Sequence, residues 1–251
     1  MSKGSLYTYI ENNIATIEFG HSASNSFPSE LLNRLTTSLN ELSINEDVHI
    51  IVLRSEGEKT FCAGASFDEL VSISNLKEGK KFFLGFANVI NAIRSNSKMV
   101  IGRIQGKVVG GGVGLAAACD YCLATEQASI KLSEFTIGIG PFVIEPAVRR
   151  KIGLAAFSEL TLDASSWQNA YWAKEKGLYA KVFESIRELD EEVNILAGKL
   201  SGYNSEALKA MKKTLWEGTD HWNVLLENKA EISGNLVLSE FTKSALEKFK
   251  K

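Results

Sequence analysis

The segment from Lys98 to Thr125 constrains the fold more than any other part of the chain. An apolar run of strand length ends at Ile104, three consecutive glycines follow at Gly110–Gly112, and an alanine-rich stretch leads to a second apolar run that begins at Tyr121. Glycine permits a tight turn after the first run, and alanine favours a short helix. A helix that joins two buried strands is a crossover connection, which indicates an α/β architecture.

Hydrophobic periodicity extends this alternation along the first part of the chain. Strands are predicted over residues 14–19 and 50–53, and helices from residue 28 and over residues 78–95, where apolar side chains recur at helical spacing. From about residue 142 onward the strand signal almost vanishes. Helices are predicted there over residues 187–200, 205–216, 221–232 and 236–250, with Gly202, Gly218 and Gly234 at positions typical of C-terminal caps.

Composition limits the class of protein. The chain has 251 residues, 45% hydrophobic and 23% charged, which is typical of a folded globular protein. We expect an α/β core domain at residues 1–195 and a helical region at residues 196–251. A formal net charge of −2 provides no basic field for nucleic acid or an anionic membrane. Three cysteines do not make a secreted disulfide framework, and the N-terminus lacks the apolar core of a signal peptide. We therefore expect a cytoplasmic protein with no nucleic-acid or membrane partner.

The triple glycine is the strongest functional signal. A glycine turn that opens a helix directs free N–H groups of the first helical turn towards a phosphate, a carboxylate or a developing oxyanion. The alternative is a tight packing contact between strand and helix. Residues Gly112 to Ala117 also match a G-x-G-x-x-A dinucleotide pattern. The match is weak, because the predicted helix is short and a dehydrogenase fingerprint belongs in a full βαβ unit.

Two further segments carry candidate chemistry. The loop Thr60–Ser66 is built from small residues, and Ser66 is placed to cap a helix that begins at Phe67. Glu134 is the single carboxylate in an apolar, glycine-rich stretch, and such an environment raises a carboxyl pKa and favours a role as a proton carrier. The alternative for Glu134 is a buried structural glutamate. The Cys119–Cys122 spacing lacks a partner pair, so we expect no metal site.

Three segments and their order along the chain resemble the crotonase superfamily, the enoyl-CoA hydratase/isomerase family. The segments are FCAGAS, GKVVGGGVGLAAACD and the stretch with the glutamate that follows. The early HSASNSF segment is similar to the turn that contacts coenzyme A in that family. The resemblance implies an α/β fold of repeated ββα units with a C-terminal helical trimerisation region. It also implies an acyl-CoA thioester as substrate, no cofactor beyond the coenzyme A of that substrate, and a homotrimer or a dimer of trimers.

The resemblance assigns roles to individual residues. The backbone N–H groups of Ala65 and Gly111 would form an oxyanion hole for the thioester carbonyl, and Glu134 would move a proton on the acyl chain. The residues that the resemblance implies for acyl-CoA binding are Ala23, Ala63, Gly64, Ala65, Ser66, Phe67, Gly110, Gly111 and Glu134.

Departures from the family pattern leave the reaction open. Where two-glutamate hydratases of the family carry a second acid, this chain has Gly114. One glutamate suffices to move a proton from Cα to Cγ, which isomerises a 3-enoyl to a 2-enoyl thioester. Glu145 would be a second acid for hydration if it points inward, and otherwise it stabilises a helix start. Hydratase and isomerase stay open, with a decarboxylase and a non-catalytic acyl-CoA-binding or RNA-binding homologue as alternatives.

Overall fold

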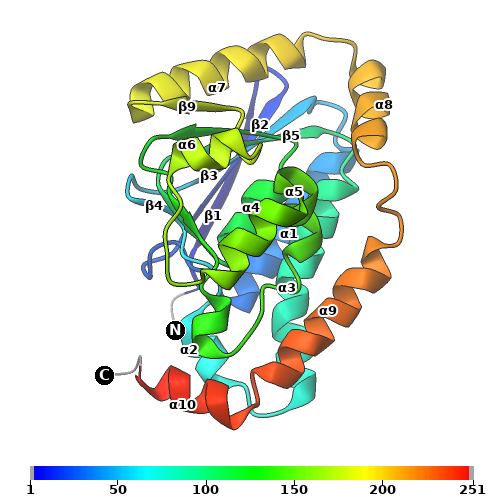
Figure 1. Cartoon of the computed structure of the whole chain (residues 1–251). Helices are drawn as coiled ribbons and strands as arrows, with labels where there is room; N and C mark the ends of the chain where they lie inside the picture. The colour runs from blue at the N-terminus through cyan, green and yellow to red at the C-terminus, as the bar shows by residue number, and fades with distance from the viewer. Residues whose placement is uncertain (1–2, 249–251) are drawn as a thin grey trace.

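The computed structural model describes residues 3–248, which form two β-sheets covered by helices (Figure 1). The larger sheet has six strands in the spatial order β1 (Ser5–Glu11), β2 (Ile14–Gly20), β3 (Ile50–Ser55), β5 (Met99–Ile104), β7 (Tyr121–Thr125) and β9 (Lys181–Phe183). The β1–β2 hairpin is antiparallel, and the other neighbours pair in parallel. Parallel neighbours require crossover connections, as the alternation of strands and helices predicts.

A second, smaller sheet positions the functional segments. Its strands are β4 (Thr60–Cys62), β6 (Lys107–Val109) and β8 (Ile130–Lys131), and they pair in parallel. Each follows a strand of the larger sheet in the chain, so the predicted ββα unit recurs along the core. Because parallel strands end at the same edge, the segments that follow β4, β6 and β8 lie together. These segments are the small-residue loop, the triple glycine and the segment that carries Glu134.

Helices cover both faces of the larger sheet. One face packs against α1 (Ser29–Ile44), α3 (Leu76–Arg94) and α4 (Gly111–Ala118), with α2 (Phe67–Ser72), α5 (Glu145–Leu162) and α6 (Ala170–Glu175) completing this side (Figure 1). The inward side chains of β2, Ala15, Ile17 and Phe19, are fully buried, as their alternation predicts. On the opposite face, α7 (Ile186–Ser201) places Leu189 and Val193 against the sheet.

The C-terminal helices fold back on the core. After α8 (Ser205–Leu215), helix α9 (Trp222–Leu236) packs along α3, and α10 (Glu240–Lys248) contacts the 3-10 turn η1 (Glu134–Ile137). The side chain of Asp120 holds α8, because it accepts hydrogen bonds from Lys212 Nζ at 2.5 Å and from Trp216 Nε1 at 2.7 Å. The expected boundary between residues 195 and 196 lies inside α7. No described helix is long and apolar enough to cross a membrane.

Several sequence expectations require correction. Strand β9 lies in the part predicted to be helical. A further strand, β6, lies in the chain between the two strands expected around the triple glycine and belongs to the smaller sheet. Gly234 is not a cap, because it lies within α9 and faces Gly79 of α3, where an added Cβ would lie 2.8 Å from the Gly234 carbonyl oxygen. The helix predicted over 236–250 begins at Glu240, and residues 249–250 lie outside the described chain.

Candidate active site

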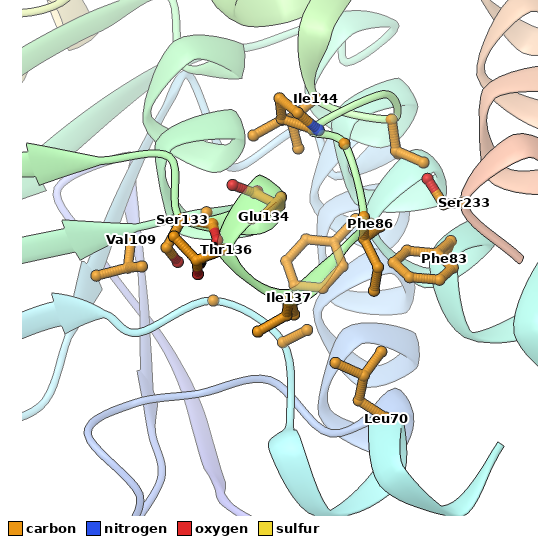
Figure 2. A pocket seen from close by; sticks show the side chains of 18 of the residues that line it. Leu70, Phe83, Phe86, Val109, Ser133, Glu134, Thr136, Ile137, Ile144 and Ser233 are labelled. Atoms are coloured by element: carbon orange, nitrogen blue, oxygen red, sulfur yellow. Dashed lines mark hydrogen bonds between the residues drawn. The ribbon is translucent and has the colours of Figure 1, made fainter. Parts of the chain in front are cut away.

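A cavity of about 480 Å³ lies where the three strands of the small sheet end (Figure 2). Seven of the residues predicted to bind acyl-CoA line it: Ala63, Gly64, Ala65, Phe67, Gly110, Gly111 and Glu134. The other two predicted binding residues, Ala23 and Ser66, do not line it, and neither does Glu145. The fold therefore brings the oxyanion candidates and the candidate proton carrier together around one space.

The loop after β4 leaves one backbone donor unused. Gly64 has a φ of +89°, a conformation that side chains rarely adopt, and an added Cβ would lie 3.1 Å from the carbonyl oxygen of Val109. The Gly64 carbonyl accepts from Phe27 N–H at 2.8 Å, and Ser66 N–H donates to the Phe27 carbonyl at 2.9 Å. These two bonds flank Ala65, whose own N–H donates to no atom of residues 3–248.

Ser66 and Ala23 support this loop from outside the cavity. The Ser66 hydroxyl accepts from the backbone N–H of Glu69 and caps α2, as predicted. Ala23 is exposed in the turn before Asn25, and the carbonyl of its neighbour Ser24 accepts from Ala63 N–H at 3.1 Å. The turn therefore lies directly beside the loop, although Ala23 itself lies outside the cavity.

The glycine turn after β6 supplies the second donor. Gly110 has φ +52° and ψ −119°, which only glycine adopts readily, and its N–H donates to the Lys131 carbonyl at 2.9 Å. Gly111 is the first residue of α4, so its N–H has no intrahelical acceptor, and it finds none elsewhere in the described chain. An added Cβ at Gly111 would lie 2.3 Å from the ring of Phe86. Both oxyanion candidates thus border the cavity with unused N–H groups.

Glu134 opens the 3-10 turn that follows β8. Its Oε1 lies 3.0 Å from the position that a Cβ on Gly110 would take, so the carboxylate lies directly against the glycine turn. Its Oε2 is buried with no hydrogen-bond partner among the described residues. Burial raises the pKa of Glu134 to about 7. A carboxyl group that titrates near neutral pH is suited to accept and return a proton.

The space beside Gly114 is occupied. An added Cβ there would lie 2.3 Å from Cγ2 and 2.6 Å from Cβ of Ile144, which itself lines the cavity. Glutamate at position 114 therefore does not fit without a change at Ile144. A direct exchange of Gly114 for glutamate would disturb packing instead of adding an acid to the site.

Glu145 is the first residue of α5 and is held by two cations. Its carboxylate pairs with Arg149 Nη1 at 3.3 Å and with Lys229 Nζ at 3.5 Å. The structure places it at a helix start, outside the cavity that holds Glu134. Glu134 is thus the single acidic side chain among the described residues that line the cavity.

The cavity walls include residues that the sequence did not indicate. Phe83 and Phe86 come from the predicted apolar stripe of α3, but the sequence does not show which members of that stripe face a cavity. Residues Phe142, Val143 and Ile144 precede α5, and Ser233 comes from α9. The position of Ser233 depends on the return of α9 to the core, for which no local signal exists in the sequence.

Two other hypotheses are not supported by the local structure. The dinucleotide pattern from Gly112 to Ala117 lies inside α4 and is entirely buried. No group of three or more histidine, cysteine or acidic side chains among residues 3–248 is placed to hold a metal ion. Cys62, Cys119 and Cys122 are free and buried.

Comparisons with known proteins agree with the sequence resemblance. The family model for enoyl-CoA hydratase/isomerase matches residues 9–246. The chain is 32% identical over 193 residues to the peroxisomal Delta(3,5)-Delta(2,4)-dienoyl-CoA isomerase of Arabidopsis thaliana, covering 71% of this chain and 68% of that protein. It is 25% identical over 242 residues to a probable enoyl-CoA hydratase of Bacillus subtilis (strain 168), covering 96% and 93%.

The structural comparison confirms the predicted fold. The crystal structure of enoyl-CoA hydratase from Bacillus halodurans matches with a TM-score of 0.90 at 23% identity, covering 97% of this chain and 99% of that one. Together with the family model, which spans almost the whole described chain, this establishes the relationship. The chain belongs to the enoyl-CoA hydratase/isomerase family of the crotonase superfamily.

Proposed function

We propose that the protein isomerises 3-enoyl-CoA thioesters to 2-enoyl-CoA thioesters, with Glu134 as the proton carrier. The observation that carries this proposal is the presence of one acidic side chain, Glu134, in a cavity bordered by the unused N–H groups of Ala65 and Gly111. A relative that covers 71% of the chain is named as a dienoyl-CoA isomerase. Coenzyme A enters as part of the substrate, and the proposal requires no other cofactor.

The proposed reaction moves one proton and one double bond. The Glu134 carboxylate takes a proton from Cα, and the electron pair of that C–H bond delocalises onto the thioester oxygen. The Ala65 and Gly111 N–H groups stabilise the resulting enolate charge. As the carbonyl re-forms, the double bond moves to Cα–Cβ and Glu134 returns the proton to Cγ. One group that accepts and then donates completes the cycle without net change of the protein.

Hydration of a 2-enoyl-CoA is the second candidate, because a relative that covers 96% of the chain is named a probable enoyl-CoA hydratase. Hydration requires activation of a water and protonation of Cα, and this cavity offers a single carboxylate for both steps. A decarboxylase would use the oxyanion donors without a base, and a non-catalytic binding protein would use neither the donors nor Glu134 for turnover.

The test is incubation with 2-enoyl, 3-enoyl and 3-hydroxyacyl-CoA esters, followed by chromatography and mass measurement. Isomerisation leaves the mass unchanged and converts the 3-enoyl ester, whereas hydration adds one water to the 2-enoyl ester. Repetition in heavy water detects proton exchange at Cα. Conversion of the 2-enoyl ester to a 3-hydroxyacyl ester, without any conversion of the 3-enoyl ester, would overturn the isomerase proposal. No conversion of any ester would favour a binding protein.

The pH dependence should report the ionisation of Glu134. Because burial raises its pKa to about 7, the carboxyl is protonated below that value and cannot accept the Cα proton. We expect kcat/KM to rise with pH and to level off above about 7. The same raised pKa means that the protonated form stabilises the fold at low pH, and that this contribution is lost as pH rises through about 7. A kcat/KM profile with no inflection near neutral pH would contradict the role of Glu134.

Assembly into a homotrimer or a dimer of trimers stays a prediction, and the surface supports it. Large apolar side chains are exposed on several helices, including Leu154 and Leu162 on α5, Val224 on α9 and Phe241 on α10. Such side chains would be buried if they came together in a contact between subunits. We expect light scattering at micromolar concentration to give three or six times the mass of the chain. The mass of a single chain would contradict the prediction.

A further inference from the structure

One wall of the cavity carries the hydroxyl group of a serine from a C-terminal helix. Ser233 of α9 lines the cavity and is 1% exposed. Figure 2 shows it on the side opposite Val109, Ser133 and Thr136. The cavity lining also includes five apolar, largely buried residues, Phe83, Phe86, Phe142, Val143 and Ile144. The other polar lining side chains, Lys131, Ser133, Glu134, Thr136 and Ser165, come from β8, η1 and the loop after α5.

The Ser233 hydroxyl group borders the cavity from within α9. Serine within a helix ordinarily bonds the carbonyl one turn earlier or points into solvent. Here the residue is buried within α9 and lines the cavity instead. A serine hydroxyl at a cavity wall can both donate to and accept from a group of a ligand, so Ser233 is placed to bond a ligand that fills this part of the cavity.

Ser233 cannot move away from the cavity, because α9 is held tightly against α3. An added Cβ at Gly234 would lie 2.6 Å from the backbone nitrogen of Lys80, so the two helices touch along their backbones. Lys80 Nζ also pairs with Glu227 at 2.9 Å and with Glu231 at 3.1 Å. The helix crossing therefore fixes where the neighbouring Ser233 lies.

We propose that Ser233 forms a hydrogen bond with an oxygen substituent on the acyl chain, remote from the thioester, and so selects acyl-CoA substrates that carry a hydroxyl or keto group there. This inference rests on the proposed acyl-CoA function. The oxyanion donors and Glu134 would fix the reacting end of the substrate, and an acyl chain that crosses the cavity from the side of Ser133 and Thr136 would reach Ser233 (Figure 2).

The preferred substituent is neutral. A carboxylate at the end of the acyl chain would require a cation, and Lys131, the one cation among the described lining residues, lies on β8 and donates to the Ser165 carbonyl at 2.6 Å. The nearest candidate on the helix of Ser233 is Lys229, which lies 5.9 Å from the ring centroid of Phe142 and pairs with Glu145. A hydroxyl or keto oxygen matches a serine donor without leaving a buried charge unpaired.

The test compares pairs of 3-enoyl-CoA esters of equal length, one ending in a methyl group and one bearing a hydroxyl or keto group near the chain end, over increasing chain lengths. For at least one length we expect the wild-type protein to prefer the oxygenated ester. Ser233→Ala should lower kcat/KM for that ester by about tenfold, the size of one net hydrogen bond, and change the methyl ester by less than about twofold. Ser205→Ala, an exposed serine on α8, is the matched control and should change neither.

The outcomes separate this inference from the proposed function. If the wild-type protein converts both series equally at every length, or if Ser233→Ala affects both esters equally, the role of Ser233 is wrong and the isomerase proposal stands. If the wild-type protein converts neither series, the proposed function itself fails. Circular dichroism and thermal unfolding of Ser233→Ala establish that the variant is folded, and alanine in a helix interior favours that result.

Discussion

Replacement of Glu134 by glutamine is expected to lower kcat by roughly 10²–10⁴, the usual contribution of a general acid–base group. Glutamine keeps the shape of the side chain, but an amide cannot accept the Cα proton or return it to Cγ. Glu134 is the single carboxylate among the described lining residues, so no neighbour is placed to replace it. Binding of an unreactive acyl-CoA should stay nearly unchanged, because the proposed contacts of the Ala65 and Gly111 N–H groups with the thioester oxygen do not involve the Glu134 side chain. Steady-state kinetics and calorimetric titration measure the two effects separately.

Glu145→Gln is the matched control for this prediction. Glu145 lies at the start of α5 and pairs with Arg149 and Lys229, outside the cavity. We expect its loss to change kcat by less than about threefold, which corresponds to a weakened helix-dipole and ion-pair interaction. If Glu145→Gln is as damaging as Glu134→Gln, or if Glu134→Gln keeps most of its activity, the one-glutamate mechanism is wrong.

That Gly111, Ala65 and Glu134 belong to one candidate site could be predicted from the sequence, because each lies in a short segment with a local signal. The glycines around Gly111, the small residues around Ala65 and the lone acid Glu134 are each visible in a few consecutive residues. The small sheet that gathers them was not predicted. Its strands span two or three residues each, which is too short for a hydrophobic period to be detected.

The rest of the cavity could not be predicted, because its walls depend on contacts between distant segments. Gly114 marks an absent acid in the sequence, but only the fold shows that Ile144 fills the space beside it. In the sequence, Gly234 occupies a position that is typical of a helix cap. In the structure it lies where α9 packs closely on α3, and this packing leaves no space for a side chain. Ser233 has no motif at all, and it becomes a candidate for substrate selection only once α9 has returned to the core.

The second large effect is expected at the oxyanion donors. Gly111→Pro removes one of the two N–H groups that border the cavity, and we expect it to lower kcat by roughly 10²–10³, the usual cost of one lost oxyanion donor. Proline is well tolerated at the first position of a helix, which Gly111 occupies in α4. The new side chain nevertheless meets the ring of Phe86, at 2.3 Å from the Cβ position. A loss of activity therefore has to be separated from this steric effect.

Gly111→Ala makes that separation, because it adds the same Cβ against Phe86 and keeps the N–H. A second background, Phe86→Leu, removes the two ring atoms that lie nearest to the Cβ position, Cε1 and Cζ. In that background we expect the alanine variant to retain most of its turnover and the proline variant to lose the full factor of roughly 10²–10³. Circular dichroism has to match among the variants for the kinetic comparison to count. Of the two variants, alanine keeps the backbone N–H at position 111 and proline lacks it. Equal activity of the folded proline and alanine variants would therefore show that the Gly111 N–H does not stabilise the enolate.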